Sequence, residues 1–372
     1  MQGAPVGISP LGVLRPGAYW VVREERNRPD NAAVAPSRRP GYLKMPWTYA
    51  TTTRMAGIDG QSRLVKNEIW AVGGGKGGTG KTYLSASLAI GLAKLGKRVI
   101  AIDADLGCAN LHTALGADPP AATLSDFIKG RVKNLNDVLG DTSLPTLRLI
   151  SGAHDFLEIA NPKYTEKMRL IRQIQDLDVE YIILDLGAGT AFNSLDFFLA
   201  ADRGILTVIP EPTSIENVYR FIKSAFYRRF KRAVRHPEMK ALVSCAMDQK
   251  NERGIRTPHD LITGVEAIDA EVGGRLRKTM AQFSPKLVVN QVRSQDDAAL
   301  GLSMRSSCSK YFGIQVEYLG FVEYDDCVWR AMKRKRPPLM EYPDAPSSRG
   351  AGTVLANLLK GEQIAFDLCV RG

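Results

Sequence analysis

The chain has few of the residues from which disulfide frameworks and metal clusters are built: its 372 residues include five cysteines and four histidines. No two cysteines are spaced as Cys-x-x-Cys and their number is odd, which argues against a disulfide framework, a zinc site or a metal cluster. No apolar stretch approaches the roughly 18 residues of a membrane-spanning helix. Residues 1–54 lack the hydrophobic segment of a secretion signal, so we expect a cytoplasmic protein.

Acidic residues are outnumbered by basic ones. There are 39 Asp and Glu against 50 Lys and Arg, which gives a net charge of +11 and an isoelectric point near 9.4. A basic balance favours anionic partners such as nucleic acid or lipid head groups. It does not distinguish between them, and basic residues also form ordinary solvated surface.

Residues 73–82 form the most informative run in the chain. The segment Gly75–Thr82 matches the phosphate-binding pattern G-x-x-x-x-G-K-[ST]. Before it, Ile69–Val72 is apolar enough for a buried strand. After it, leucines recur at helical spacing, at Leu84, Leu88, Leu92 and Leu95. Strand, glycine-rich turn and helix therefore follow in the order that a phosphate-binding loop requires.

This loop predicts a site for a nucleoside triphosphate with magnesium. Its glycines let backbone N–H groups converge on phosphate oxygens, and the helix N-terminus adds a positive dipole end. Lys81 can reach the β- and γ-phosphates, and the Thr82 hydroxyl can bind Mg²⁺. We expect every residue of the loop to contact the nucleotide: Gly75, Lys76, Gly77, Gly78, Thr79, Gly80, Lys81 and Thr82.

Two further predicted strands end in acids. Val99–Ile102 is a short apolar run followed by Asp103 and Asp105, and Tyr181–Leu184 ends at Asp185. Nucleotide sites collect at the carboxyl ends of parallel strands, and an acid in the position of Asp185 supports Mg²⁺. An acid about 20 residues beyond a glycine-rich loop can also bind the ribose of a dinucleotide. The Gly-Lys-Thr ending of the loop favours a triphosphate instead.

A second lysine in the loop narrows the class of nucleotide-binding protein that the sequence indicates. Lys76 begins the run Lys-Gly-Gly-Thr-Gly-Lys-Thr, which resembles the deviant Walker A signature of the MinD/ParA family of dimeric ATPases. The resemblance implies an ATP-bound homodimer in which Lys76 crosses the interface to the nucleotide of the partner subunit. A charge supplied in this way would offset negative charge that develops during γ-phosphate transfer. The plainer interpretation of Lys76 is a solvated loop cation.

The resemblance also implies roles for the other candidate residues. Asp103 and Asp185 would hold Mg²⁺ through water, together with Thr82, and Asp105 would position the attacking water. Leu287–Asn290 is predicted to be a strand, and the family commonly uses an Asn at the position of Asn290 on adenine. The implied cofactors are ATP and Mg²⁺, and the implied catalytic residues are Lys76, Lys81 and Asp105.

Residues 185–190 and 210–217 look like the FlhG/FleN branch of this family, which regulates flagellar number and placement. Tyr83 departs from the family pattern, because a small hydroxyl residue usually follows the Walker Thr. The resemblance implies an ATP-hydrolysing dimerisation switch that positions flagella, the division site or chromosomes. The alternative is a nucleotide-dependent scaffold with negligible turnover that binds DNA or a partner protein.

The expected fold is α/β: a P-loop NTPase domain over residues 65–345, with a mainly parallel twisted sheet flanked by helices. Residues 1–64 are predicted to be a disordered, basic and Pro-rich extension, residues 226–284 an inserted helical subdomain, and residues 346–372 a helical tail. Further expected elements are helices over 165–177, from Ile215 or Glu216, and from near Cys327, and strands over 204–210 and 316–322.

Three segments outside the phosphate site are candidates for interactions. Residues 226–236 are basic with interleaved aromatics, and they could bind nonspecific DNA or a partner protein or form a solvated helix face. A second basic run, residues 333–336, precedes two prolines. The apolar tail could be a membrane anchor, but only Lys360 and Arg371 could serve its polar face. We therefore expect the tail to pack on the core, with peripheral contact to the nucleoid or inner membrane as a further possibility.

Overall fold

The computed structural model describes residues 67–105, 109–152, 164–233 and 257–359, and two single positions, 241 and 243. The predicted N-terminal extension, residues 106–108 directly after Asp105, and the last part of the predicted tail, residues 360–372, lie outside the described residues. Within the described ranges, no helix is long and apolar enough to cross a membrane.

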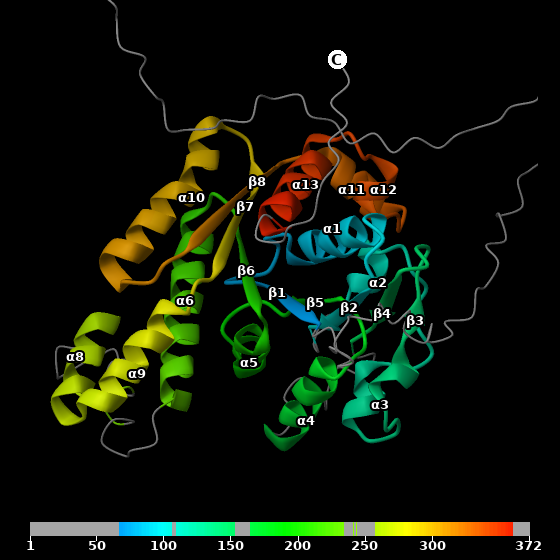
Figure 1. Ribbon diagram of the computed structural model, residues 1–372. Coiled ribbons are helices and arrows are strands. Elements are labelled where there is room, and N and C mark those ends of the chain that lie inside the picture. The colour runs from blue at the N-terminus through cyan, green and yellow to red at the C-terminus, as the bar shows by residue number, and fades with distance from the viewer. Residues whose placement is uncertain are drawn as a thin grey trace, which may run out of the picture. The chain divides into compact units, whose positions relative to one another are not determined.

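An eight-stranded sheet forms the centre of the described chain, in the order β3-β4-β2-β5-β1-β6-β7-β8 (Figure 1). The strands are β1 Glu68–Gly74, β2 Val99–Ala104, β3 Gly140–Asp141, β4 Leu147–Ile150, β5 Tyr181–Leu186, β6 Arg203–Val208, β7 Lys286–Val292 and β8 Glu317–Glu323. Each neighbouring pair is parallel except β3 with β4. The predicted α/β fold with a mainly parallel sheet is confirmed.

The order of the strands marks the place where a ligand site is expected. From β1 the chain goes to β2 on one side, and it later places β6 on the other side of β1. The carboxyl end of β1 is therefore a topological switch point, where open α/β sheets bind ligands. The glycine-rich loop begins at this end.

Helices cover both faces of the sheet. The longer ones are α1 Lys81–Lys94, α4 Tyr164–Gln175, α5 Phe192–Ala200, α6 Pro212–Ala233, α8 Pro258–Ile268, α9 Ala270–Ala281, α10 Gln295–Ser307, α11 Asp326–Lys333 and α13 Pro346–Leu359. Short ones are α2 Leu111–Ala114, α3 Leu124–Ile128, α12 Pro338–Glu341, the 3₁₀ turn η1 Leu135–Val138 and the π turn η2 Cys308–Phe312. Helices α1 and α13 lie on one face, and α4, α5 and α6 lie on the other (Figure 1).

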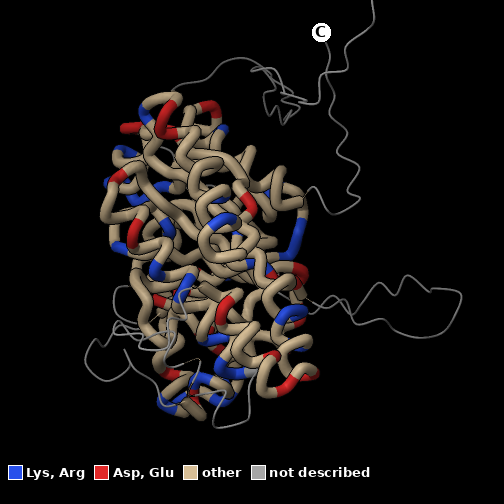
Figure 2. Tube along the Cα trace, turned by 90° about the vertical axis from the view of Figure 1, so that its left-hand side faces the viewer, with Lys and Arg blue, Asp and Glu red and all other residues tan. Residues whose placement is uncertain are grey.

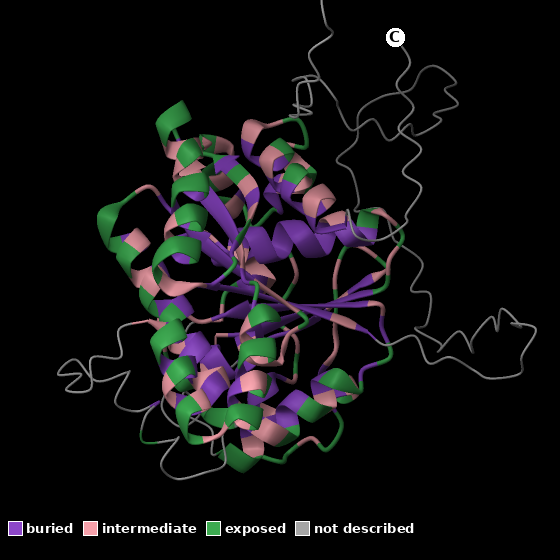
Figure 3. Cartoon of the chain, turned by 60° about the vertical axis from the view of Figure 1, so that its left-hand side comes forward, coloured by how far each residue is buried: buried purple, intermediate pink, exposed green. Residues whose placement is uncertain are grey.

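The central strands β1, β2 and β5 and helix α1 are buried almost throughout, and Figure 3 shows this buried centre in purple. Helix α1 is buried on its outer side as well, because α13 packs across it and against β8. A Cβ at Gly91 of α1 would lie 2.5 Å from Leu355 of α13, so the helices approach at a position without a side chain. The described part of the predicted tail of residues 346–372 is thus helix α13, Pro346–Leu359, packed on α1 and β8.

The helix after β6 begins at Pro212, three residues before the predicted start at Ile215. Proline is favoured in the first turn of a helix, because its missing N–H would have no intrahelical partner there. Helix α6 continues to Ala233, so the basic run beginning at Tyr227 belongs to its last turns. In the predicted inserted subdomain, the described structure beyond α6 consists chiefly of α8 and α9. Capping residues start both helices, Thr257 for α8 and Asp269 for α9.

Candidate functional site

The glycine-rich loop joins β1 to α1 with its backbone open on one side. Gly78 and Gly80 have φ angles of 79° and 85°, which suit glycine. A Cβ at Gly77 or Gly78 would meet nothing within 4 Å. On the other side the loop is fixed: a Cβ at Gly75 would lie 2.3 Å from the carbonyl carbon of Asn217 in α6. The loop therefore leaves its backbone exposed for a ligand while the body of the protein holds it in place.

Lys81 is a buried cation without a close counter-charge. No carboxylate lies within the 4 Å ion-pair distance of its ammonium group among the described residues, and its hydrogen bond is a 3.4 Å contact with the Lys76 carbonyl oxygen. Burial lowers the pKa of Lys81, and the more distant charges of Asp185 and Asp105 oppose that shift. Burying an uncompensated cation is costly, and a phosphate group in the loop would supply the missing negative charge.

Asp103 and Asp185 stand side by side, in register on the neighbouring strands β2 and β5. Both are buried. The backbone N–H groups of Asp105 and Leu111 donate to the two carboxylate oxygens of Asp103, at 3.1 and 2.9 Å. Burial, with the nearby charge of Asp185, raises the pKa of Asp103 to about 8. Two adjacent buried carboxylates at this edge of the sheet are a suitable environment for a divalent cation.

Asp185 connects this carboxylate pair to the phosphate loop. The Ser85 hydroxyl of α1 donates to its Oδ1 atom at 2.9 Å. Burial raises the pKa of Asp185 to about 6, and the hydroxyls of Thr82 and Ser85 and the charge of Lys81 oppose the shift. The structure therefore brings the predicted Lys81 and Thr82 of the loop close to the carboxylate of the predicted Asp185 in β5.

The segment after β5 lies against both the loop and Asp105. The Gly189 N–H donates to the Gly74 carbonyl oxygen at 3.0 Å. A Cβ at Gly187 would lie 3.1 Å from the Oδ1 atom of Asp105. A side chain at residue 187 would thus crowd the Asp105 carboxylate, which lies close to the backbone that follows Asp185.

Lys76 is paired within its own chain. Its ammonium group lies 2.5 Å from the Oε2 atom of Glu211 and 3.4 Å from the Thr213 hydroxyl. The side chains of Lys76 and Glu211 are 30% and 53% exposed. Sequence reasoning left residues 211–214 without a role, although Glu211 directly follows the predicted strand 204–210 and is thus the same kind of signal as Asp103 and Asp185.

Asn290 supports the phosphate loop from β7. Its Nδ2 atom donates to the Thr79 carbonyl oxygen at 2.8 Å, and its Oδ1 atom accepts from the Gln291 N–H. Gln291, which sequence reasoning missed, donates from Nε2 to the Gly78 carbonyl oxygen at 3.0 Å and has a φ of 58°. The structure therefore places Asn290 at the loop, with its amide engaged by the protein. Contact with adenine stays a prediction.

The unusual Tyr83 is buried beside α13. Burial raises the pKa of its hydroxyl to about 12, and the hydroxyls of Ser347 in α13 and Ser87 in α1 oppose the shift. The tyrosine thus belongs to the contact between α1 and α13.

The basic run at the end of α6 is used largely inside the protein. The rings of Phe226, Tyr227 and Phe230 are buried in the core, so they do not offer exposed stacking surfaces. Arg228 and Arg232 pair with the buried Asp196 of α5. In the same segment, which was predicted to bind DNA or a partner, Arg229 lies over the Phe283 ring and Lys231 is exposed. Residues 234–236 lie outside the described ranges.

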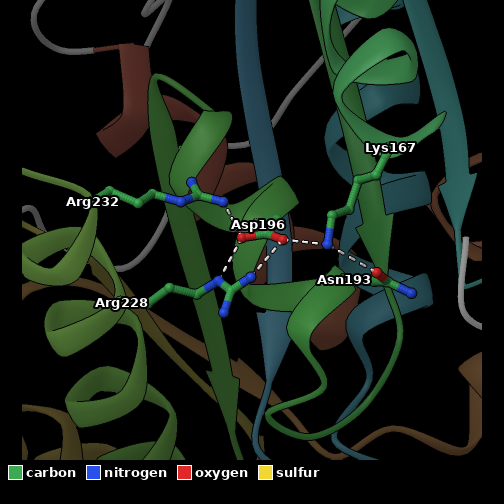
Figure 4. Close-up of polar contacts among 5 residues, drawn as sticks. All are labelled: Lys167, Asn193, Asp196, Arg228 and Arg232. Carbon is green, nitrogen blue, oxygen red and sulfur yellow. Dashed lines mark hydrogen bonds and ion pairs between the residues drawn. The ribbon is translucent and has the colours of Figure 1, made fainter. Parts of the chain in front are cut away.

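Asp196 is the centre of a charged cluster that joins three helices (Figure 4). Lys167 of α4 approaches it from one side and also donates to Asn193 at 3.2 Å, while Arg228 and Arg232 of α6 approach from the other. Burial alone would raise the pKa of Asp196, but the three cations together hold it below its ordinary range. The cluster fixes α5, which directly follows the Gly187–Gly189 segment, against α4 and α6.

Comparisons with known proteins agree with this geometry. A family model described as the CobQ/CobB/MinD/ParA nucleotide binding domain matches residues 70–339. Antiactivator FleN of Pseudomonas aeruginosa is 38% identical over 158 residues, which are 42% of this chain and 55% of FleN. Flagellum site-determining protein YlxH of Helicobacter pylori is 31% identical over 164 residues, 41% of this chain and 52% of YlxH. The chain thus spans about half the length of these two relatives.

Among solved structures, the septum site-determining protein MinD of Pyrococcus horikoshii, complexed with Mg-ADP, superimposes with a TM-score of 0.53. The match covers 82% of this chain and all of that MinD chain, at 19% sequence identity. At this identity the likeness concerns the fold.

Proposed function

Because the chain belongs to the CobQ/CobB/MinD/ParA nucleotide-binding family, we propose that it is a magnesium-dependent ATPase whose dimerisation is switched by ATP. The observation that carries the proposal is Lys81: a buried cation beneath an open glycine-rich backbone, next to the paired carboxylates of Asp103 and Asp185. This combination requires a ligand that brings negative charge to the loop and a cation to the carboxylates. ATP with Mg²⁺ brings both.

The residues present fit this ligand. The loop Gly75–Thr82 would hold the phosphates, and Thr82 would bind Mg²⁺ with Asp103 and Asp185 supporting it through water. In the described ranges, no three His, Cys, Asp or Glu side chains lie close enough together to hold a metal ion alone. That suits Mg²⁺, which usually keeps several waters and is bound through one or two carboxylates and substrate phosphates. Asp105 would position the attacking water beside Gly187.

Lys76 would act on the nucleotide of the partner subunit, as a charge supplied across a homodimer interface. In the single chain it is held by Glu211, so the dimer requires this ion pair to open. The switch proposed here thus has two states for one lysine: paired with Glu211 in the monomer, and directed at phosphate in the ATP-bound dimer. Hydrolysis would remove the phosphate that attracts Lys76 in the dimer, and Lys76 would then pair with Glu211 again.

We propose a positioning role for this switch in the cytoplasm, placing flagella, the division site or chromosomes. Two similar proteins bear names of this kind, flagellum site-determining YlxH and septum site-determining MinD. An ATP-bound dimer that associates with a cellular surface and leaves it on hydrolysis would serve such a role. Slow turnover coupled to dimerisation is sufficient, since hydrolysis then acts as a timer.

Light scattering on a sizing column tests the switch. The parent protein and Lys76→Ala are run with magnesium and either ADP or ATP. We expect the parent to dimerise with ATP alone and Lys76→Ala to remain monomeric. A parent protein that is monomeric with both nucleotides would refute the dimer, and hydrolysis measured on the same samples separates an ATPase from a scaffold that only binds.

Two further substitutions separate binding from hydrolysis. Lys81→Ala should abolish ATP binding, because it removes the buried cation of the loop, whereas Lys94→Ala at the exposed end of the same helix should not change it. Asp105→Ala should retain ATP binding and trap the dimer. Titration of a fluorescent ATP analogue and a phosphate-release assay measure the two effects. An Asp105→Ala protein that hydrolyses at the parent rate would show that Asp105 does not position water.

A further inference from the structure

The run Lys333–Arg336 is the longest uninterrupted basic stretch in the sequence, and neither the nucleotide site nor the core uses it. Elsewhere in the sequence Lys and Arg occur singly or in adjacent pairs, and Figure 2 shows them in blue along the trace. The run covers the last residue of α11 and the turn that follows, and all four side chains are exposed. Pro337, directly after it, is buried, so the chain returns to the core at that point.

Helix α11 extends this basic run along one exposed stripe. Residues 326, 329, 330 and 333 are exposed, and their spacing of three and four places them on the same face of the helix. Ala331, on the opposite side, is fully buried. The stripe carries Trp329, Arg330 and Lys333, with Trp329 64% exposed and the Lys333 ammonium group 5.0 Å from its ring centre.

Most of these cations are not neutralised by the protein. Arg334 pairs with Glu341. No carboxylate of the described chain lies within 4 Å of Arg330, Lys333 or either remaining cation of the run, and the acid of the stripe, Asp326, is at the other end of the helix. Four positive charges and one exposed indole therefore lie within eight residues, and none of the four cations pairs with a carboxylate of the described chain.

The backbone of the turn after α11 is strained at one of the basic residues, Lys335. The N–H groups of Lys335 and Arg336 donate to the carbonyl oxygens of Met332 and Ala331, at 2.9 and 3.0 Å, which is the Schellman pattern of a helix end. Lys335 occupies the left-handed position of this motif, with a φ of 52°, where glycine is usual. A residue with a side chain is strained in this conformation.

A structural role accounts for only part of this pattern. Basic residues in the last turn of a helix interact favourably with its dipole, which would explain Lys333 and Arg334. It does not explain Lys335 in a position that suits glycine, or Arg336 beyond the helix end, or the exposure of Trp329. These features are those of a surface that binds an anion outside the chain.

We propose that Trp329, Arg330, Lys333, Lys335 and Arg336 form a surface that binds the phosphate backbone of double-stranded nucleic acid. Adjacent phosphates of a duplex accept contacts from closely spaced Lys and Arg, and release of counterions supplies the binding free energy. In α11 and α12, both fully described, the exposed large apolar side chains are Trp329 and Met340. This is too little apolar area for insertion into a lipid surface, which scales with the apolar area buried. The proposal goes beyond the nucleotide switch and does not depend on it.

The test measures binding of the full-length protein to a fluorescent DNA duplex of arbitrary sequence by anisotropy, over a range of salt concentrations, with ADP and with ATP. The test variant combines Lys333→Gln, Lys335→Gly and Arg336→Gln. The control variant removes the same charge from exposed lysines elsewhere, with Lys133→Gln, Lys278→Gln and Lys310→Gln, none of which has an ion pair in the described chain. Both variants have the same net charge.

We expect the test variant to bind at least tenfold more weakly than the control. The slope of log K against log salt should become shallower by about 2.7, since each lost phosphate contact changes it by about 0.9. Lys335→Gly alone should also weaken binding while leaving the urea midpoint unchanged or higher, because glycine relieves the strained backbone. Weaker binding by a protein of undiminished stability cannot come from misfolding.

Three outcomes would overturn the proposal: a parent protein that binds no duplex with either nucleotide, equal losses in the test and control variants, or a basic surface that binds phosphatidylserine vesicles and not the duplex. The dimerisation measurement is made separately on the same variants. If they dimerise as the parent does, the switch is intact and the result concerns the surface alone.

Discussion

Replacing Glu211 with Gln should make the ATP-dependent dimer tighter. Glu211 holds Lys76 at 2.5 Å within the chain, and the proposed dimer needs that lysine at the partner's nucleotide. Glutamine keeps the shape and polarity of the side chain but removes its charge. The monomer then loses an interaction that competes with dimerisation, whereas the phosphate contacts of Lys76 in the dimer are retained.

The magnitude follows from the exposure of the pair. Both side chains are partly open to water, at 30% and 53%, and exposed ion pairs contribute about 0.2–1 kcal/mol each. One pair opens in each subunit, so the substitution should favour the dimer by about 0.4–2 kcal/mol. The apparent dissociation constant of the dimer should therefore fall about 2-fold to 30-fold, because about 1.4 kcal/mol corresponds to a factor of ten.

The assay is sedimentation equilibrium with magnesium and ATP, in an Asp105→Ala background that is expected to prevent hydrolysis during the run. Glu216→Gln is the matched control: it makes the same chemical change five residues further along the chain, in α6, at an exposed residue without an ion pair in the described chain. The control should leave the dissociation constant unchanged. High salt should reduce the difference between the two variants, since it screens the exposed pair.

A dimer that is unchanged or weaker in Glu211→Gln would refute this reasoning. An unchanged constant would mean that the Lys76–Glu211 pair does not compete with the interface. A weaker dimer would mean that Glu211 contributes to the interface itself, so that its charge stabilises the dimer more than the monomer.

Two stability predictions follow from the packing. Asp196→Asn should lower the free energy of unfolding by about 3–5 kcal/mol, because it leaves the buried Lys167 without its counter-charge; Asp178→Asn, which removes an exposed partner, should change it by less than about 0.5 kcal/mol. Gly116→Ala should cost more than Gly96→Ala: both residues have a positive φ, but a Cβ at residue 116 would lie 2.9 Å from a proline ring, whereas at residue 96 it would meet nothing within 4 Å. The strain of a side chain at a positive φ costs about 1 kcal/mol at each position. The difference between the two variants in the free energy of unfolding, measured by urea denaturation, therefore reports the steric clash at residue 116. Equal losses within either pair would refute the corresponding contact.

Much of the nucleotide site could be predicted because its signals are local. A glycine-rich turn between an apolar strand and a helix is read within about 25 residues of sequence, and strands buried on both faces are continuous apolar runs. Asp103 and Asp185 each end such a run, so their positions at the same edge of the sheet followed from parallel pairing. The register of β2 with β5 confirms that they are neighbours.

Helix faces were less predictable than strand ends. The basic and aromatic residues of the segment beginning at residue 226 suggested an exposed binding face, because composition does not say which side of a helix faces the core. In the structure Phe226 and Phe230 point into the core, and Arg228 pairs with Asp196, 32 residues earlier in the chain. Whether a cation is free or neutralised depends on such distant partners.

The sequence by itself determined the family, the identity of the phosphate loop and which strands end in residues of the site. Each of these depends on residues that are adjacent in the chain. The tertiary structure alone decided what those residues touch. It paired Lys76 with Glu211, 135 residues away, and placed Asn290 and Gln291 against the loop. It also left Lys333, Lys335 and Arg336 without a carboxylate partner in the described chain. These contacts join segments that meet only when the sheet and its helices pack, so no pattern within one segment could specify them.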